Sequence, residues 1–134
     1  MEKEFIPYEQ ALELKELGFD EPCLKYQWND TVESKWMSGS VRPNHLHIQK
    51  FFKDSEDNYT ISIPTFSQAF RWFRDKYNLC GWVQESYFKG RQLYQYHISR
   101  IETLKIISNV FEGTFEEAEL DCLKKLIKLV KTKN

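Results

Sequence analysis

The sequence predicts an α+β fold in which three principal helices pack on an antiparallel sheet of four to six strands. Two patterns predict this class. Apolar residues recur at three- and four-residue spacing in three segments, as on one face of an amphipathic helix, and several shorter segments alternate apolar with polar residues, as half-buried strands do. The strand-like segments come in hairpin-like pairs, which favours an antiparallel sheet with the helices on one side.

The three expected helices have recognisable ends and span residues 7–17, 65–77 and 114–130. Gly18 follows the first helix, where a left-handed backbone conformation suits glycine. Thr65 with Gln68, and Thr114 with Glu117, have the spacing of capping boxes, in which each side chain satisfies a free backbone N–H group at the start of a helix. The last helix carries a wide apolar stripe, which is typical of docking on a sheet.

The apolar faces of these helices supply the expected core. In each helix the core positions are large apolar residues that recur on a single face. The predicted core includes seven of them: Leu14, Leu17, Phe66, Phe70, Phe73, Leu123 and Ile127.

The clearest strand pair is a hairpin of residues 80–88 and 92–99, joined by Lys89, Gly90 and Arg91. Other strand-like segments precede the second helix and have the spans 23–28, 32–37, 45–52 and 59–63. The sequence leaves two regions open. Residues 29–60 hold the weakest patterns, and the apolar residues within 101–112 suit either a strand or a short helix.

Size, charge and cysteine use predict one cytoplasmic domain. A chain of 134 residues is expected to form a single domain, residues 1–134, around its own core. Its net charge of −1 provides no overall field that favours nucleic acid or an anionic membrane. No apolar stretch approaches the roughly 20 residues that span a bilayer, and the charged start is followed by too few apolar residues for a secretory signal. The three isolated cysteines suit a reduced compartment.

The histidines form no convincing metal site. His45 and His47 share one face of a strand-like segment, a geometry that zinc uses, but only His97 and scattered carboxylates are left to complete a site. Surface histidines are the favoured interpretation, and no metal is predicted. No cofactor is expected either, because no two of the five glycines have the G-x-G spacing of a phosphate-binding loop.

An enzyme alternative rests on a cysteine paired with one of the histidines as a nucleophile. Cys23 and Cys80 are the candidates, whereas Cys122 lies on the apolar side of the last helix and is expected in the core. None of these cysteines lies in a recognisable catalytic motif, and free cysteines are commonly buried as small hydrophobic residues. The sequence therefore predicts a protein that is not an enzyme.

A surplus of aromatic residues predicts a contact surface. The 10 Phe, 7 Tyr and 4 Trp are too many for the core of a domain this size, and exposed Trp and Arg side chains are frequent interface anchors. Arg71, Trp72 and Arg74 form the first expected partner-binding set, on the solvent-side flank of the second helix. Trp36 and Arg42 form the second set. Contact of the first set with RNA, by charge and stacking, is the alternative.

Three strings, in the order of the predicted helices, carry a resemblance. They are EQALELKELGFDEPC at residues 9–23, PTFSQAFRWFRDKY at residues 64–77 and EEAELDCLKKLI at residues 116–127. Together they resemble a group of small uncharacterised proteins from phages, prophages and mobile elements of Bacteroidota bacteria. The resemblance covers the helices and their flanks, under half of the chain. It brings no reaction, cofactor or catalytic residue with it.

The resemblance implies a function against the defence systems of a bacterial host. Small non-catalytic phage proteins often bind and block a component of host defence, so stable binding to a host protein or nucleoprotein is expected. Inhibition of an RNA-guided nuclease, such as a Cas13-type CRISPR nuclease, is the particular role implied. The alternative is a small-molecule-binding protein that sequesters a nucleotide immune signal, with Trp82, Tyr94 or Tyr96 stacking on the base.

Overall fold

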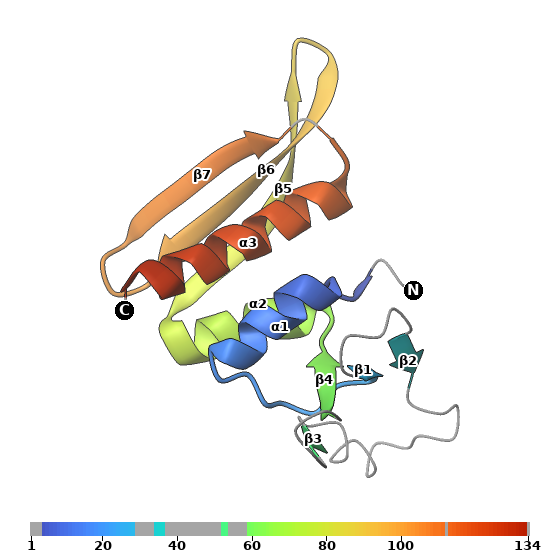
Figure 1. Cartoon of the computed structure of the whole chain (residues 1–134). Coiled ribbons are helices and arrows are strands. Elements are labelled where there is room, and N and C mark those ends of the chain that lie inside the picture. Colours follow the sequence, from blue (N-terminus) through green and yellow to red (C-terminus); the bar gives the residue numbers. More distant parts are fainter. Residues whose placement is uncertain (1–3, 29–33, 37–51, 54–58, 112, 134) are drawn as a thin grey trace. The chain divides into compact units, whose positions relative to one another are not determined.

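A computed structural model describes residues 4–28, 34–36, 52–53, 59–111 and 113–133 of the chain (Figure 1). These residues form three helices and seven strands. The helices are α1 (Tyr8–Glu16), α2 (Phe66–Tyr77) and α3 (Phe115–Lys133). The strands are β1 (Lys25–Trp28), β2 (Ser34–Trp36), β3 (Phe52–Lys53), β4 (Tyr59–Ile63), β5 (Leu79–Phe88), β6 (Arg91–Arg100) and β7 (Lys105–Phe111). The predicted α+β class is confirmed.

The chain divides into two compact units, Met1–Thr65 and Phe66–Asn134. The first unit holds α1 and a four-stranded sheet in the order β2-β1-β4-β3, and the second holds α2, α3 and a three-stranded sheet in the order β5-β6-β7. All pairings in both sheets are antiparallel. The described strands thus fall into two sheets, and the expected single sheet of four to six strands is not confirmed. The expectation of one domain stays a prediction.

In the first unit, α1 ends as its sequence predicts. Gly18 adopts a φ of 102°, and the amide groups of Gly18 and Phe19 donate to the carbonyls of Lys15 and Leu14 at 3.0 and 2.9 Å. This pair of bonds is the Schellman arrangement, which satisfies carbonyl groups left free at a helix end. The turn also buries Phe19, which joins Leu14 in the core.

The sheet of the first unit is built around β1 and β4, which pair from Lys25 with Ile63 to Trp28 with Thr60. Ile61 and Ile63 of β4 are buried, and α1 packs on this strand. Lys25 is also buried, and its ammonium group lies 5.3 Å from the centre of the Phe5 ring. Water stabilises an exposed charge, and burial removes that stabilisation. The attraction between the Lys25 ammonium and the face of the Phe5 ring replaces part of it. Of the expected strand 45–52, residues 45–51 lie outside the described residues.

In the second unit, β5 and β6 form a hairpin that pairs over its full length, from Leu79 with Arg100 to Phe88 with Arg91. The ambiguous segment after residue 100 is a strand: β7 pairs with β6 from Arg100 with Lys105 to Tyr94 with Phe111. Helix α3 packs on β5 and β6, and α2 packs on β5 and α3 (Figure 1). The core of this unit is made of fully buried aliphatic and aromatic side chains: Phe73, Leu79, Ile98, Leu123, Leu126 and Ile127.

The alternation of side chains gives this sheet a covered face and an open face. A Cβ atom added at Gly81 would lie 3.1 Å from Cys122 Sγ and 3.1 Å from Leu126 Cδ1, so Gly81 faces α3. Its register partners Ile98 and Ile107 share that face. The residues on the opposite side form what we call the open face: Cys80, Trp82, Gln84, Leu93, Gln95, His97, Ser99, Ile106, Ser108 and Val110.

Six of the seven predicted core residues are buried, but Leu17 is half-buried. The prediction for Leu17 is wrong because this residue is the C-cap of α1, where the chain leaves the helix and its apolar stripe ends. Sequence periodicity extends the apolar stripe to Leu17, whereas the helix itself ends one residue earlier, at Glu16.

The second predicted capping box is present at the start of α3. The Glu117 amide donates to Thr114 Oγ1 at 3.1 Å, and the Thr114 amide donates to Glu117 Oε1 at 3.2 Å. Replacing Thr114 by Ala is expected to lower the free energy of unfolding by about 1 kcal/mol, because one free amide loses its acceptor. Urea denaturation measures this change. Thr114→Ser, which keeps the hydroxyl, is the control and should cost clearly less; an equal loss in both variants contradicts the capping function.

Candidate functional site

The β5–β6 hairpin extends beyond the rest of its sheet. Strand β7 pairs with β6 only up to Tyr94, so no third strand among the described residues lies beside the hairpin beyond that point (Figure 1). Its two-residue turn has Lys89 at φ 51° and Gly90 at φ 77°. Two central residues with positive φ define the type I′ turn, whose twist matches that of the paired strands. The turn therefore closes the hairpin at its projecting end.

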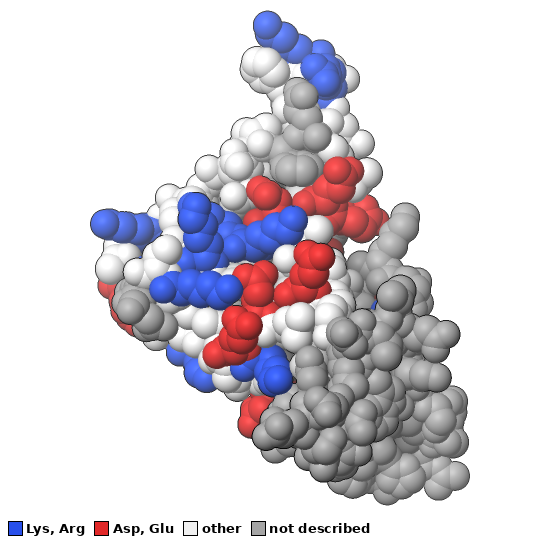
Figure 2. Space-filling model, viewed as in Figure 1, with Lys and Arg blue, Asp and Glu red and all other residues white. Residues whose placement is uncertain are grey.

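The tip carries two large aromatic side chains that are open to solvent. Tyr87 is 69% exposed and Phe88 is 62% exposed. As consecutive strand residues they point to opposite faces of the ribbon. We call Tyr87, Phe88, Lys89 and Arg91 the hairpin tip. The Lys89 ammonium lies 5.4 Å from the centre of the Phe88 ring, and Figure 2 shows Lys and Arg side chains at the projecting end.

Polar contacts order one side of the hairpin below its tip. The Glu85 carboxylate accepts a hydrogen bond from the Tyr87 hydroxyl at 3.4 Å and another from Gln92 Nε2 on the facing strand. The bonds link residues two apart on β5 and across the hairpin. They connect the Tyr87 hydroxyl with polar groups on both strands of the hairpin.

The open face continues from the tip along β5. Phe88 and Trp82 lie on the same side of this strand, six residues apart in sequence, and Trp82 is 41% exposed. On β7, Ile106 and Val110 add apolar surface at 61% and 51% exposure. Exposed apolar side chains gathered on one face of a sheet mark contact surfaces more often than single exposed residues do.

His97 lies at the centre of the open face. Its ring lies against Trp82, with centroids 5.0 Å apart and planes at 30°, and its Nδ1 lies 2.7 Å from Ser108 Oγ. The other ring nitrogen, Nε2, is buried and has no hydrogen-bond partner within the described part of the chain. Cys80 is on the same face, two positions along β5 from the register partner of His97. This is the only one of the proposed cysteine–histidine pairs whose members the described residues place on one face.

The other cysteines do not resemble activated nucleophiles. Burial raises the pKa of the Cys122 thiol to about 12, with the carboxylates of Asp121 and Glu119 adding to the shift. Burial also raises the pKa of the Cys23 thiol, and Glu21 adds to that effect. A thiol with a raised pKa holds its proton at neutral pH and is a poor nucleophile. His45 and His47 lie outside the described residues.

Of the two partner-binding sets expected from the sequence, only some residues are exposed as predicted, and some lie outside the described part of the chain. Arg71 and Arg74 are exposed on α2, as expected. The position expected for Trp72 is wrong: its side chain is 6% exposed, not on a solvent-side flank. Trp36 is the last residue of β2, but its side chain is not among those described, and Arg42 lies outside the described residues.

Trp72 is buried because the apolar arc of α2 is wider than the predicted stripe. Its ring packs edge-on against Phe73, with centroids 5.1 Å apart, and against Tyr77 at 5.5 Å. The Lys76 ammonium lies 5.2 Å from the centre of the indole. A large aromatic at the border of a stripe gains more by joining its neighbours than by facing water.

The residues proposed to stack on a nucleotide base do not share a face. Trp82 is on the open face, whereas Tyr94 and Tyr96 point to the covered face, where the Tyr94 ring meets Phe115 edge-on at 5.8 Å. Tyr96 is buried, and burial raises the pKa of its hydroxyl, opposed by a hydrogen bond with Asn109. The described residues also hold no group of three or more His, Cys, Asp and Glu side chains that is suited to a metal ion.

Comparison with known proteins adds no relative: the chain matches no family model, no curated protein and no solved structure. Within the described helices, none combines the length and apolar character needed to cross a membrane.

The hairpin tip is a feature that the sequence reasoning missed. A signal was present, because Tyr87 and Phe88 directly precede the two-residue turn at Lys89 and Gly90. Aromatic residues beside a tight turn lie at the end of a ribbon, far from the centre of a sheet, and are less easily buried. The exposure of Tyr87 and Phe88 depends, however, on how far β7 pairs along the hairpin.

Proposed function

We propose that this protein acts by stable, non-catalytic binding to a macromolecule of a bacterial host, with the hairpin tip as its anchor. The observation that carries the proposal is the pair of aromatic side chains, 69% and 62% exposed, at the end of a ribbon that projects beyond its sheet. Aromatic residues are enriched among the few side chains that dominate interface energies, because they bury a large area at a low cost in conformational entropy.

The tip favours a partner of particular chemistry. Phe88 and Tyr87 suit an apolar cleft, and Lys89 and Arg91 beside them suit an acidic rim around it. The open face, with Trp82, Ile106 and Val110, provides further apolar contact on the Phe88 side of the ribbon. A protein surface offers such a combination of cleft and rim, and we therefore propose a protein, or the protein part of a nucleoprotein, as the partner.

The resemblance of the helical strings supports a partner among host defence components. In this proposal the chain is a phage or mobile-element protein that works in the host cytoplasm, and the target is an RNA-guided nuclease of the Cas13 type. Burial raises the pKa of the Cys23 and Cys122 thiols, which disfavours these two cysteines as nucleophiles. Sequestration of a nucleotide stays an alternative prediction, which the opposite orientation of Trp82 and Tyr94 does not favour.

Affinity capture from host lysate, with and without RNase, tests the proposal. We expect a retained protein that RNase does not remove, and Phe88→Ala or Tyr87→Ala should weaken its binding by at least about 2 kcal/mol, close to thirtyfold. Phe115→Ala is the matched control, since Phe115 is a half-exposed aromatic of the same unit away from the tip. Loss of the partner after RNase treatment shows contact through RNA and contradicts the protein-binding proposal.

The same assay separates the tip from the surface expected on α2. Arg71→Ala and Arg74→Ala remove the exposed cations of that helix and leave the hairpin intact. If these two variants lose the partner while Phe88→Ala keeps it, the partner binds to α2 and the hairpin tip is not the anchor. If no protein or RNA is retained above background by the parent, the binding function itself is refuted.

A further inference from the structure

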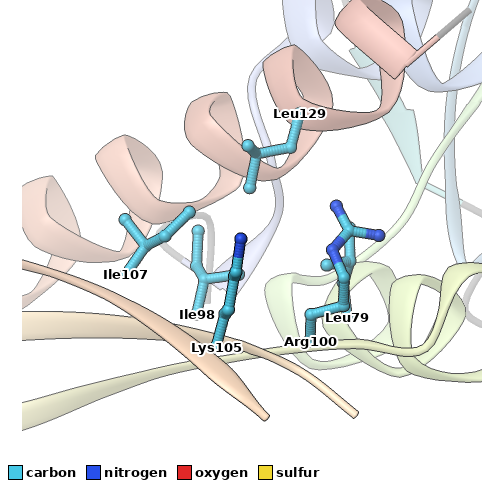
Figure 3. A pocket seen from close by; sticks show the side chains of 6 residues that line it. All are labelled: Leu79, Ile98, Arg100, Lys105, Ile107 and Leu129. Carbon is cyan, nitrogen blue, oxygen red and sulfur yellow. The ribbon is translucent and has the colours of Figure 1, made fainter. Parts of the chain in front are cut away.

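A small pocket opens on the covered face of the second unit, well away from the hairpin tip. Its volume is about 80 Å³. Six residues line it: Leu79, Ile98, Arg100, Lys105, Ile107 and Leu129 (Figure 3). Leu79, Arg100 and Lys105 lie opposite one another on β5, β6 and β7. Ile98 and Ile107 pair with each other two residues away on β6 and β7, and Leu129 reaches toward the sheet from α3. Leu79 and Ile98 are fully buried, so the floor of the pocket is apolar.

Two positively charged side chains, those of Arg100 and Lys105, line this pocket. Arg100 and Lys105 are register partners on β6 and β7, so their side chains leave the sheet side by side on the same face. Figure 3 shows both rising from the sheet toward the level of α3. Like charges directly opposite each other on neighbouring strands destabilise a sheet. The pair is therefore unfavourable in the absence of a counter-charge.

The structure provides no such counter-charge among the described residues. Within the described part of the chain, no carboxylate lines the pocket, and neither Arg100 nor Lys105 forms an ion pair there. The acid closest in sequence, Glu102, instead accepts a hydrogen bond from Asn78 Nδ2 at 3.0 Å.

The turn between β6 and β7 sets the pairing of Arg100 with Lys105. The Leu104 amide donates to the Arg100 carbonyl at 2.8 Å, and Leu104 adopts a φ of 58°. A leucine with positive φ is under strain of roughly 1–2 kcal/mol, which the surrounding contacts must offset. The turn thus fixes the register in which Arg100 lies opposite Lys105.

We propose that this pocket binds a short aliphatic carboxylate. Guanidinium and ammonium groups are the natural partners of a carboxylate, and arginine can bind it through two parallel hydrogen bonds. The four aliphatic walls suit a branched hydrocarbon chain of a few carbons. A cavity needs about 10–15 Å³ to hold one water, so this pocket accepts a head group with a short chain but excludes a nucleotide. The site is independent of the proposed macromolecular partner.

An NMR titration of amide signals tests the site with three probes of similar size. Isovalerate carries both the carboxylate and the branched chain, inorganic phosphate carries only the anion, and isoamylamine carries the chain with the opposite charge. Isovalerate is expected to shift the signals of residues 98–107 with a Kd of about 1 mM, as befits so small a ligand. Phosphate is expected to bind more weakly, and isoamylamine not at all.

Variants identify the groups responsible. Arg100→Gln and Lys105→Gln are each expected to weaken isovalerate binding by about tenfold, since each removes a charged hydrogen-bond donor. Lys124→Gln removes an exposed charge of α3 that does not line the pocket, and it should bind like the parent. Lys105 lies at an exposed strand end, so its variant keeps the test valid even where Arg100→Gln fails to fold.

A second readout distinguishes a ligand site from a structural pair. Without ligand, Lys105→Gln is expected to melt at the same temperature as the parent or slightly higher, because a like-charge repulsion is removed. Three results overturn the proposal: no shift at isovalerate concentrations far above the millimolar range, binding of phosphate as tight as that of isovalerate, or an equal loss of binding in Lys124→Gln.

Discussion

Replacing Phe73 by Ala is expected to lower the free energy of unfolding by about 3–5 kcal/mol. Phe73 is 0% exposed, and its ring packs against Trp72 at 5.1 Å and Tyr77 at 6.0 Å between centroids. Truncation loses the favourable free energy of moving the ring from water into the core. It also leaves a cavity that the neighbouring side chains cannot fill, because their aromatic rings are large and rigid. Urea denaturation measures the change, and the thermal midpoint should fall by roughly 10–20 °C.

Phe88→Ala is the matched control for this loss. It makes the same chemical change at a side chain that is largely exposed at the hairpin tip, and it should alter stability by no more than about 0.5 kcal/mol. The two variants therefore separate core packing from surface contact: Phe73→Ala lowers stability, whereas Phe88→Ala lowers partner binding. A Phe73→Ala protein as stable as the parent contradicts the burial of this face of α2.

Replacing Gly81 by Val is expected to destabilise the protein by about 1–3 kcal/mol, although valine suits strands better than glycine does. The reason is the close approach of α3. A Cβ atom at this position would lie 3.1 Å from both Cys122 Sγ and Leu126 Cδ1, and a branched side chain would press further into the helix. Gln84→Val, on the open face of the same strand, is the control and should change stability by about 0.5 kcal/mol or less.

A double-mutant cycle tests whether the contact with α3 is the cause. Gly81→Ala adds the single methyl group, and Leu126→Val shortens the side chain that it would meet. Combined, the two changes should cost at least about 0.5 kcal/mol less than the sum of the separate losses, because the space removed on one element is supplied by the other. Strict additivity would falsify the proposed packing of Gly81 under Leu126.

The helices were predictable because their signals are local. Gly18 ends α1 in the expected left-handed conformation, and Thr114 with Glu117 forms the expected capping box at α3. Such signals involve residues within a few positions of one another, so the rest of the chain has little influence on them. The border of an apolar stripe is different. Trp72 was expected on the solvent side and is buried, since the width of the covered arc depends on what packs against the helix.

The strands also fall into those that local signals predict and those that depend on pairing between distant segments. The β5–β6 hairpin was predictable from alternation and from its Lys89-Gly90 turn, which are local features. The segment after residue 100 was not, because its apolar residues fit a strand or a helix equally well. It becomes β7 by pairing with β6, and that pairing is a contact between different segments of the chain. The separation of the described strands into two sheets likewise depends on pairing partners that no local pattern specifies.

By itself, the sequence determined the α+β class, where the helices start, most of the core and the presence of surplus aromatic residues. Only the tertiary structure decided which aromatics are exposed, and it selected Tyr87 and Phe88 over Trp72. It also placed Arg100 opposite Lys105 beneath Leu129, a combination drawn from three elements. The physical reason is common to both. Helix caps and turns are specified by neighbours in sequence, whereas exposure and the meeting of charges depend on which segments cover one another after folding.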